Sequence, residues 1–194
     1  MLFLCNLIKD VIKLYKKALI SFVLVSLSIF LGVPDYSLAY TLNAVISSAC
    51  VEYGLSEQLV YCVIKAESNF NEKAVSHCDA RGLMQITRPT WEWITREYLK
   101  VDWDYDTCCF DFEKNIIVGA RFLKWISDYL DERQELLNAP KQDLLLACYN
   151  AGPGNVRKYN YTVPPFNETR HYVEKINVMT RSQALVLVLQ PNQS

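Results

Sequence analysis

The strongest constraint on the fold is a change of composition near residue 39. Residues 1–39 are about two-thirds apolar, with a positive head that holds four lysines and an uncharged stretch from Ala18 to Val33. Small residues follow at Ser37 and Ala39. This order of positive head, apolar stretch and small residues is typical of a secretory signal. The sequence therefore predicts a signal peptide over residues 1–39, cleaved after Ala39, which leaves about 155 residues (194 minus 39) for one domain.

An uncleaved membrane anchor is the alternative for the same segment. The uncharged stretch is about 16 residues long, which is short of the roughly 20 residues that span a bilayer core. If the segment is retained, Lys16 and Lys17 would stay on the inner side of the membrane. Both interpretations predict an exported protein of the periplasm, the cell envelope or the extracellular space, with membrane contact only through an uncleaved leader.

Composition excludes two broad classes of function. Lys and Arg total 20 and Asp and Glu total 21, so the net charge is -1 and offers no basic surface for nucleic acid. Hydrophobic residues make up 51% of the chain and aromatic residues 12%, which is enough to build a core and argues against disorder.

Export changes what the seven cysteines imply. One of them, Cys5, lies in the leader, and an even number in an exported domain permits up to three disulfides. Cys50 and Cys62 flank a turn at residues 54–56 and could face each other across a helical hairpin, although buried free thiols are the alternative. Without any C-x-x-C pair, a zinc site is disfavoured. The six cysteines beyond the leader are Cys50, Cys62, Cys78, Cys108, Cys109 and Cys148.

Apolar residues at helical spacing predict a mostly helical domain. Ser56 and Asp111 are expected to cap helix starts, and Gly152-Pro153 is expected to stop a helix. Residues 71–88 are polar and indicate a loop or short strand, and residues 182–194 indicate a tail that is a strand or loose. The fold class expected is α+β, predominantly α, in a single domain over residues 40–181. The helices expected cover residues 41–53, 56–69, 89–98, 111–130, 141–150 and 167–181.

Glu67 is the first candidate for chemistry. It closes an apolar helix, and a half-buried carboxyl there has its pKa raised by desolvation and can serve as an acid near neutral pH. Taken alone, a glutamate at a helix end is more often a solvated charge.

Three further segments accompany the Glu67-Ser68 pair. Residues 76–85 are S-H-C-D-A-R-G-L-M-Q, residues 146–154 are L-A-C-Y-N-A-G-P-G, and residues 164–173 are P-P-F-N-E-T-R-H-Y-V. In this order they resemble the soluble lytic transglycosylase family, glycoside hydrolase family 23, which has a lysozyme-like fold. The resemblance covers roughly residues 41–180.

The resemblance implies an enzyme that cleaves the glycan strand of peptidoglycan without a cofactor or metal. Glu67 would protonate the oxygen between N-acetylmuramic acid and N-acetylglucosamine. It would then take the proton of the 6-hydroxyl, which closes a 1,6-anhydro ring, so one carboxyl serves as both acid and base.

The resemblance also implies a set of residues around Glu67. Ser68 would help to hold the glutamate, and Tyr149 would contact Glu67 or the sugar. Tyr172 would line the cleft or pack behind Glu168. The substrate-binding residues expected are Ser68, Ser76, Gln85, Tyr149, Asn150, Glu168 and Tyr172. The sequence departs from the family pattern at Cys78, Asp79 and Cys148, the last in place of a typical alanine.

Two alternative functions remain open from the sequence. A muramidase would hydrolyse the same bond with water placed by Asp79 or another carboxylate. A non-catalytic wall-binding factor of a secretion or conjugation apparatus would keep the fold without turnover, and a secretion-machinery partner is possible in either case.

Two side hypotheses concern other residues. A calcium loop would use Asp102, Asp104, Asp106 and Glu113, although its turn position holds Thr107 instead of glycine. Trp91 and Trp93 cannot both face inward on one helix, so one of them is expected to be exposed or in the cleft.

Overall fold

A computed structural model describes the backbone of residues 36–189 and the side chains of residues 41–182. Most of the predicted leader lies outside these residues, and its cleavage stays a prediction. The chain divides into two units, residues 1–43 and residues 44–194. The first unit contributes only the opening turns of helix α2 to the described structure, and all the residues discussed below belong to the second.

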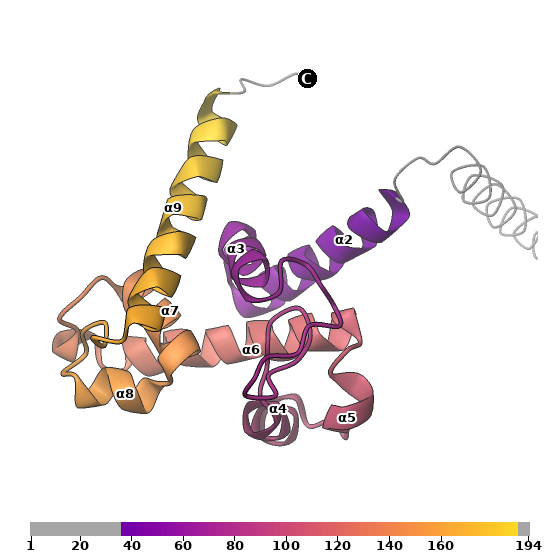
Figure 1. The fold of residues 1–194 in the computed structure, drawn as a ribbon, viewed down its shortest axis with the longest axis horizontal. Coiled ribbons are helices and arrows are strands. Elements are labelled where there is room, and N and C mark those ends of the chain that lie inside the picture. Colours follow the sequence, from indigo (N-terminus) through magenta and orange to yellow (C-terminus); the bar gives the residue numbers. More distant parts are fainter. Residues whose placement is uncertain (1–35, 190–194) are drawn as a thin grey trace, which may run out of the picture. The chain divides into compact units, whose positions relative to one another are not determined.

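The described part of the chain is built from helices and turns, with strand pairing limited to isolated bridges (Figure 1). A π-helical turn at Thr95–Leu99 follows α4, and a 3₁₀ turn at Gln134–Leu136 follows α6. The α-helices are α2 (Tyr36–Tyr53), α3 (Glu57–Glu67), α4 (Arg88–Ile94), α5 (Tyr105–Cys108), α6 (Phe112–Asp131), α7 (Lys141–Ala151), α8 (Pro153–Lys158) and α9 (Asn167–Leu189).

Helix α6 forms the centre of the second unit, and α4 and α7 both pack against it (Figure 1). Asp111 caps its start, as predicted, by accepting a hydrogen bond from the Lys114 amide at 3.1 Å. The inward face of α6 is fully buried at Ile116, Leu123 and Ile126. Burying such an apolar stripe is the main force that holds a helix of this kind in place.

The polar segment after α3 forms a compact loop, as the sequence predicted. Arg81 makes antiparallel bridges to both Val75 and Ile86, so the chain folds back and pairs with itself twice within 12 residues. Three residues of this loop adopt the left-handed backbone conformation, Asp79 with φ +58°, Gly82 with φ +78° and Gln85 with φ +49°. A Cβ atom on Gly82 would lie 2.3 Å from Asn115 Nδ2, so only glycine fits there.

The predicted stop after residue 150 is confirmed. The Gly152 backbone, at φ +85°, ends α7, and Pro153 at once starts the short helix α8, which the sequence did not predict. Gly followed by Pro both ends one helix and begins the next, because Pro is well suited to a first helical turn.

The predicted end of the last helix was wrong. The sequence indicated an end near Arg181 followed by a strand or loose tail, whereas α9 continues to Leu189. The physical reason is the absence of a stop signal, since neither Gly nor Pro occurs between residues 167 and 190.

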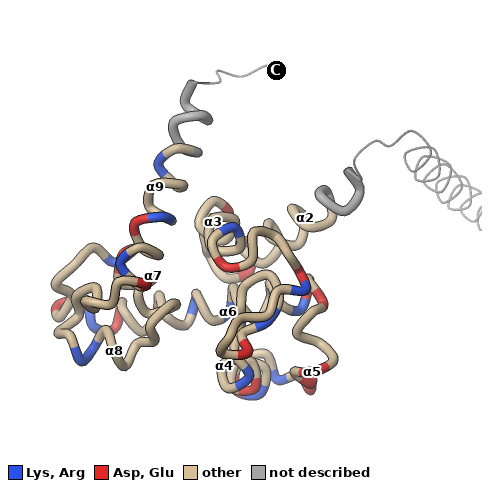
Figure 2. The backbone as a smooth tube through the Cα atoms, in the orientation of Figure 1, with Lys and Arg blue, Asp and Glu red and all other residues tan. Residues whose placement is uncertain are grey.

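Positive and negative side chains are interspersed along the described helices (Figure 2). This mixture agrees with the near-zero net charge of the sequence. Within residues 36–189, no helix combines the length and the apolar character that crossing a membrane requires.

Candidate active site

Glu67 is the last residue of α3, where the chain turns sharply. Both the amide and the hydroxyl of Ser68 donate to the Ile64 carbonyl, at 3.0 and 3.2 Å, which ends the helix. The next residues, Asn69 and Phe70, have left-handed backbones with φ 52° and 65°. Ser68 therefore fixes the end of the helix that carries Glu67, and its hydroxyl proton is directed at the helix backbone.

The half-buried carboxyl of Glu67 has a raised pKa. Burial is the largest cause and raises the pKa from 4.5 to about 7, with a smaller contribution in the same direction from the negative charge of Glu168. Tyr172 and Lys175 act in the opposite direction and lower it. Desolvation prevails because a carboxylate loses more hydration on burial than these two groups replace. The raised pKa therefore allows the side chain to hold a proton near neutral pH.

Helix α9 supplies three groups that act on Glu67, at positions 168, 172 and 175, which share one helical face. The Lys175 ammonium donates to the Ala66 carbonyl at 3.3 Å and thus lies beside the end of α3. The buried Tyr172 hydroxyl approaches Glu67, yet it completes no hydrogen bond of normal geometry with any described residue. Burial holds the pKa of Tyr172 well above its usual value, so Tyr172 remains a neutral donor.

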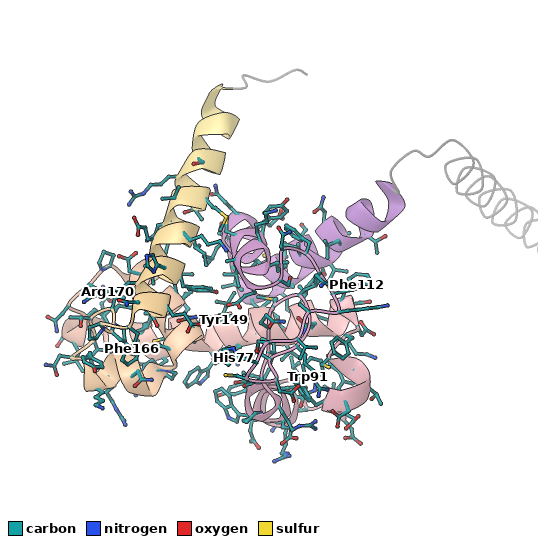
Figure 3. All side chains as sticks on the ribbon, viewed as in Figure 1. His77, Trp91, Phe112, Tyr149, Phe166 and Arg170 are labelled. Atoms are coloured by element: carbon teal, nitrogen blue, oxygen red, sulfur yellow. The ribbon has the colours of Figure 1, made fainter. Side chains whose placement is uncertain are left out.

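Tyr149 approaches the site from α7. Its hydroxyl donates to the Met84 carbonyl at 2.8 Å, across to the loop that follows α3. Burial, with a smaller contribution from the charge of Glu67, raises the pKa of Tyr149 well above its usual value. Figure 3 shows Tyr149 between the part of the unit built from α8 and α9 and the part built from α4 and α5. The tyrosine thus binds the Met84–Gln85 turn and lies close enough to Glu67 to respond to its charge.

Tyr149 also lines a pocket of about 380 Å³ that extends away from it along α4, α6 and α7. Trp93 and Trp125 form an aromatic wall with ring centres 4.7 Å apart and nearly perpendicular planes. Trp91, in contrast, is fully buried and donates its indole N–H to the Trp103 carbonyl at 2.7 Å. The prediction that Trp91 and Trp93 do not both face inward is confirmed, because Trp91 is buried and Trp93 is partly exposed and lines the pocket. The other residues that line the pocket include Gln85, Ile86, Thr87, Thr90, Phe122, Asn150 and Gly152.

Gln85 and Ser76 both close turns in the loop after α3. The Gln85 amide nitrogen donates to the carbonyls of Ala74 and Gly82, at 3.1 and 2.9 Å. The Ser76 hydroxyl accepts hydrogen bonds from two later amides, those of Cys78 and Ala80. Gln85 reaches the pocket, whereas Ser76 is engaged within its own turn.

Asn150 and Glu168 are brought close by a direct link between α7 and α9. The Thr169 hydroxyl donates to Asn150 Oδ1 at 2.8 Å, and Glu168 precedes Thr169 in the first turn of α9. The structure thus places Asn150 beside the first turn of α9, the helix whose Glu168 and Tyr172 act on Glu67.

The acidic residues near α5 have structural partners. Asp104 caps α5 through the Thr107 amide at 3.1 Å, and Asp106 binds both Arg81 and Arg88. These contacts direct the two carboxylates to different neighbours, so a calcium loop over residues 102–113 is not formed. In this Asp-rich stretch, Asp104 caps a helix and Asp106 pairs with two arginines.

The disulfide that the sequence allowed between Cys50 and Cys62 is not formed in the described structure, in which Cys50 carries a buried free thiol. The thiols of Cys78, Cys108, Cys109 and Cys148 are also free. Cys148 is fully buried directly before Tyr149, and burial raises the pKa of its thiol to about 12. It packs as a small apolar residue behind the site.

Two residues of the site were missed from the sequence. Lys175 could have been found, since it follows Glu168 and Tyr172 at helical spacing. Asn115 is a fully buried polar residue of α6 that binds the loop carrying Met84. No pattern in the sequence distinguishes it from any other asparagine in the first turns of a helix.

Comparison with known proteins supplies the context for this geometry. Residues 44–171 match the family model described as the transglycosylase SLT domain. A membrane-bound lytic murein transglycosylase F from Desulfosudis oleivorans is 37% identical over 114 residues, which cover 58% of this chain and 22% of the relative. A membrane-bound lytic murein transglycosylase C from Serratia proteamaculans is 28% identical over 172 residues, covering 71% and 45%. The chain thus spans less than half the length of these curated relatives.

Solved structures show the same fold. The 70 kDa soluble lytic transglycosylase from Escherichia coli superimposes with a TM-score of 0.63 at 23% identity, covering 75% of this chain and 24% of that one. A complex of the 70-kDa soluble lytic transglycosylase with bulgecin A gives a TM-score of 0.64 at 22% identity, covering 75% and 24%. The predicted fold class, a predominantly helical lysozyme-like domain, is confirmed.

Proposed function

Because the chain belongs to the transglycosylase SLT domain family, we propose that it is a peptidoglycan lytic transglycosylase of the cell envelope. The observation that carries this proposal is Glu67, a half-buried carboxyl with a pKa of about 7 at the meeting point of α3, α7 and α9. A group of this pKa can both give and take a proton at neutral pH, which matches the demand of a reaction with one acid–base residue.

In the proposed reaction, protonated Glu67 gives its proton to the glycosidic oxygen between N-acetylmuramic acid and N-acetylglucosamine as the bond to the muramic C1 breaks. The Glu67 carboxylate then takes the proton of the muramic 6-hydroxyl as its oxygen bonds to C1. The products are an N-acetylglucosamine end and a 1,6-anhydro end, and no water is consumed. Glu67 returns to its protonated form, so the cycle balances.

The surroundings of Glu67 support an acid that needs no second carboxylate opposite it. Asp79, the residue that a hydrolytic muramidase could use to place water, is held by Arg81 with oxygen–nitrogen distances of 2.7 and 3.1 Å. Glu168 lies near Glu67 and favours its protonated form. This arrangement supports transfer to the internal hydroxyl over attack by water.

The pocket beside Tyr149 is the place where we expect the glycan strand to lie. Gln85 and Asn150 supply polar groups at its wall, and Trp93 and Trp125 supply aromatic surface. Glycan binding by Ser76, Glu168 and Tyr172 completes the proposal, with Ser68 holding the end of α3. The affinity for the wall would come from this pocket, since the chain has a net charge of -1 and no electrostatic attraction to an anionic polymer.

The decisive experiment is digestion of purified cell wall followed by mass analysis of the released muropeptides. The proposal expects anhydro ends, each lighter by one water than a reducing end, and loss of release in Glu67→Gln. Reducing ends would show hydrolysis instead. Release that is equal in wild type and Glu67→Gln, or absent from both, would overturn the enzymatic proposal in favour of wall binding.

A further inference from the structure

A fully buried asparagine on α6, Asn115, binds the loop after α3 through both ends of its side-chain amide. Asn115 Oδ1 accepts a hydrogen bond from the Met84 amide at 2.8 Å. Its Nδ2 donates to the carbonyls of Arg81 and Cys109, at 3.0 and 2.8 Å. The Met84 and Arg81 bonds hold the loop, and the Cys109 bond ties the asparagine to the turn before α6. Buried polar groups that lose their partners are costly, so these bonds fix the backbone around Met84 relative to α6.

Helix α6 also holds the side chain of Met84, one turn further along. A Cβ atom on Gly119 would lie 2.3 Å from the Met84 sulfur and 2.9 Å from its Cβ, so the methionine sits directly against the helix backbone. The Met84 side chain is itself fully buried. Its position is therefore determined by Asn115 and Gly119 together.

The carbonyl of the same residue receives the Tyr149 hydroxyl at 2.8 Å. A tyrosine hydroxyl has one proton, and here that proton is directed at Met84. It is consequently not directed at Glu67. The other groups that act on Glu67, namely Glu168, Tyr172 and Lys175, all come from α9.

We propose that Asn115 is a positioning residue for Glu67: by fixing Met84, it holds the Tyr149 proton away from the carboxyl, which keeps its own proton for the substrate. This inference rests on the proposed function. If Met84 moved, the Tyr149 hydroxyl would be released and could donate to the Glu67 carboxylate. A new donor stabilises the charged form and makes the carboxyl a poorer acid.

The test compares four forms of the full chain: wild type, Asn115→Leu, Tyr149→Phe and the double variant. The direct readout is the carboxyl carbon-13 signal of Glu67 during a pH titration, identified by its absence in Glu67→Gln. Wild type and Tyr149→Phe are expected to titrate near pH 7, because neither directs a Tyr149 proton at Glu67. Asn115→Leu is expected to titrate lower by about one pH unit, the typical size of a single hydrogen-bond effect. The double variant should return to near pH 7, since it has no hydroxyl to release.

The same forms give a kinetic readout of wall digestion. Asn115→Leu should lower kcat at pH 7 by roughly fivefold, because a midpoint lower by one unit leaves fewer molecules with Glu67 protonated. It should also move the upper limb of the pH profile to lower pH, with little change in KM. In the Tyr149→Phe background the same substitution should not move the limb. Thr95→Val is the matched control for a general loss of stability, because it removes a different buried hydroxyl, one that donates to the Trp91 carbonyl. It should leave the upper limb of the pH profile unchanged.

A shift of the Glu67 midpoint that is equal with and without the Tyr149 hydroxyl, or no shift in either, would overturn the proposal and leave Asn115 a purely structural residue. If Asn115→Leu does not fold, Gly119→Ala displaces Met84 by a different route and must give the same dependence on Tyr149. Failure of the proposed function is separately visible, because wild type would then release no muropeptides while the titration of Glu67 could still be followed.

Discussion

Glu67 and Asp106 are two carboxylates held in opposite ways. Glu67 is half-buried at the end of α3, and its pKa rises because the groups around it replace too little of its lost hydration. Asp106 lies on the surface at α5 and binds Arg81 and Arg88, which lower its pKa. Burial without an ion pair gives a carboxyl that holds its proton near neutral pH, whereas an ion pair on the surface gives a carboxylate that stays charged and links neighbouring elements.

The largest expected effect comes from removing the reactive acid. Glu67→Gln should lower the rate of wall digestion by roughly 10³-fold, within the range for loss of general acid–base catalysis. Asp106→Asn is the matched control and should retain activity within a few-fold of wild type. The check is the rate of muropeptide release under identical conditions. If both substitutions reduce the rate equally, the contrast between the two carboxylates has no functional meaning.

The second effect concerns stability against pH. The folded pKa of Glu67 is about 7 and its reference value is 4.5, so the folded state binds the proton more tightly. Stability from this group is present below pH 4.5 and is lost as pH rises through 7, by about 3 kcal/mol in total. Urea unfolding from pH 4.5 to 8 should show this loss in wild type. In Glu67→Gln the loss should disappear, and its persistence would assign the pH dependence to other groups.

A third, smaller effect tests the pocket. Trp125→Leu should weaken glycan binding and raise KM by roughly tenfold, equal to about 1.4 kcal/mol, with kcat nearly unchanged. Phe166→Leu, an exposed aromatic residue outside the pocket lining, is the control. Thermal unfolding of both variants separates lost binding from lost folding. A fall in kcat with KM constant would argue that the aromatic wall acts on the reaction and not on binding.

The smallest expected effect is the pH dependence of the stability that Asp106 contributes. The pKa of Asp106 is lowered from 3.8, so the stability it contributes is present above that value and is lost as pH falls through the folded pKa. This sign is opposite to that of Glu67. Asp106→Asn should therefore have a slightly lower Tm than wild type at pH 7 and the same Tm at pH 2. A larger gap at pH 2 would contradict the assignment.

Much of the fold could be predicted because its signals are local. Capping by Ser56 and Asp111 and the stop at Gly152 depend only on neighbouring residues, and all three occur as expected. The extension of α9 to Leu189 was missed, because an apolar run does not reveal which structure it adopts. The choice between Trp91 and Trp93 required the packing of α4 on α6.

The candidate site was predictable only as a list of residues. The sequence indicated Glu67, Tyr149 and Tyr172, but not that the Tyr149 proton is directed at Met84. Asn115 lay outside every pattern, because its role depends on backbone groups 31 and 34 residues away along the chain. Hydrogen bonds between residues so far apart in the sequence depend on the tertiary structure, so they produce no regular spacing that the sequence could reveal.

Tyr105 joins both ends of the loop that carries Gly82 and Gln85. Its hydroxyl lies 2.6 Å from the Asp79 carbonyl and 3.0 Å from the Ile86 carbonyl, within reach of its single proton. Arg81 and Arg88 cover the same ring, with guanidinium carbons 4.8 and 4.6 Å from its centre. The amides between residues 81 and 86 should therefore exchange with deuterium as one cooperative unit, whose lifetime is set by this phenol.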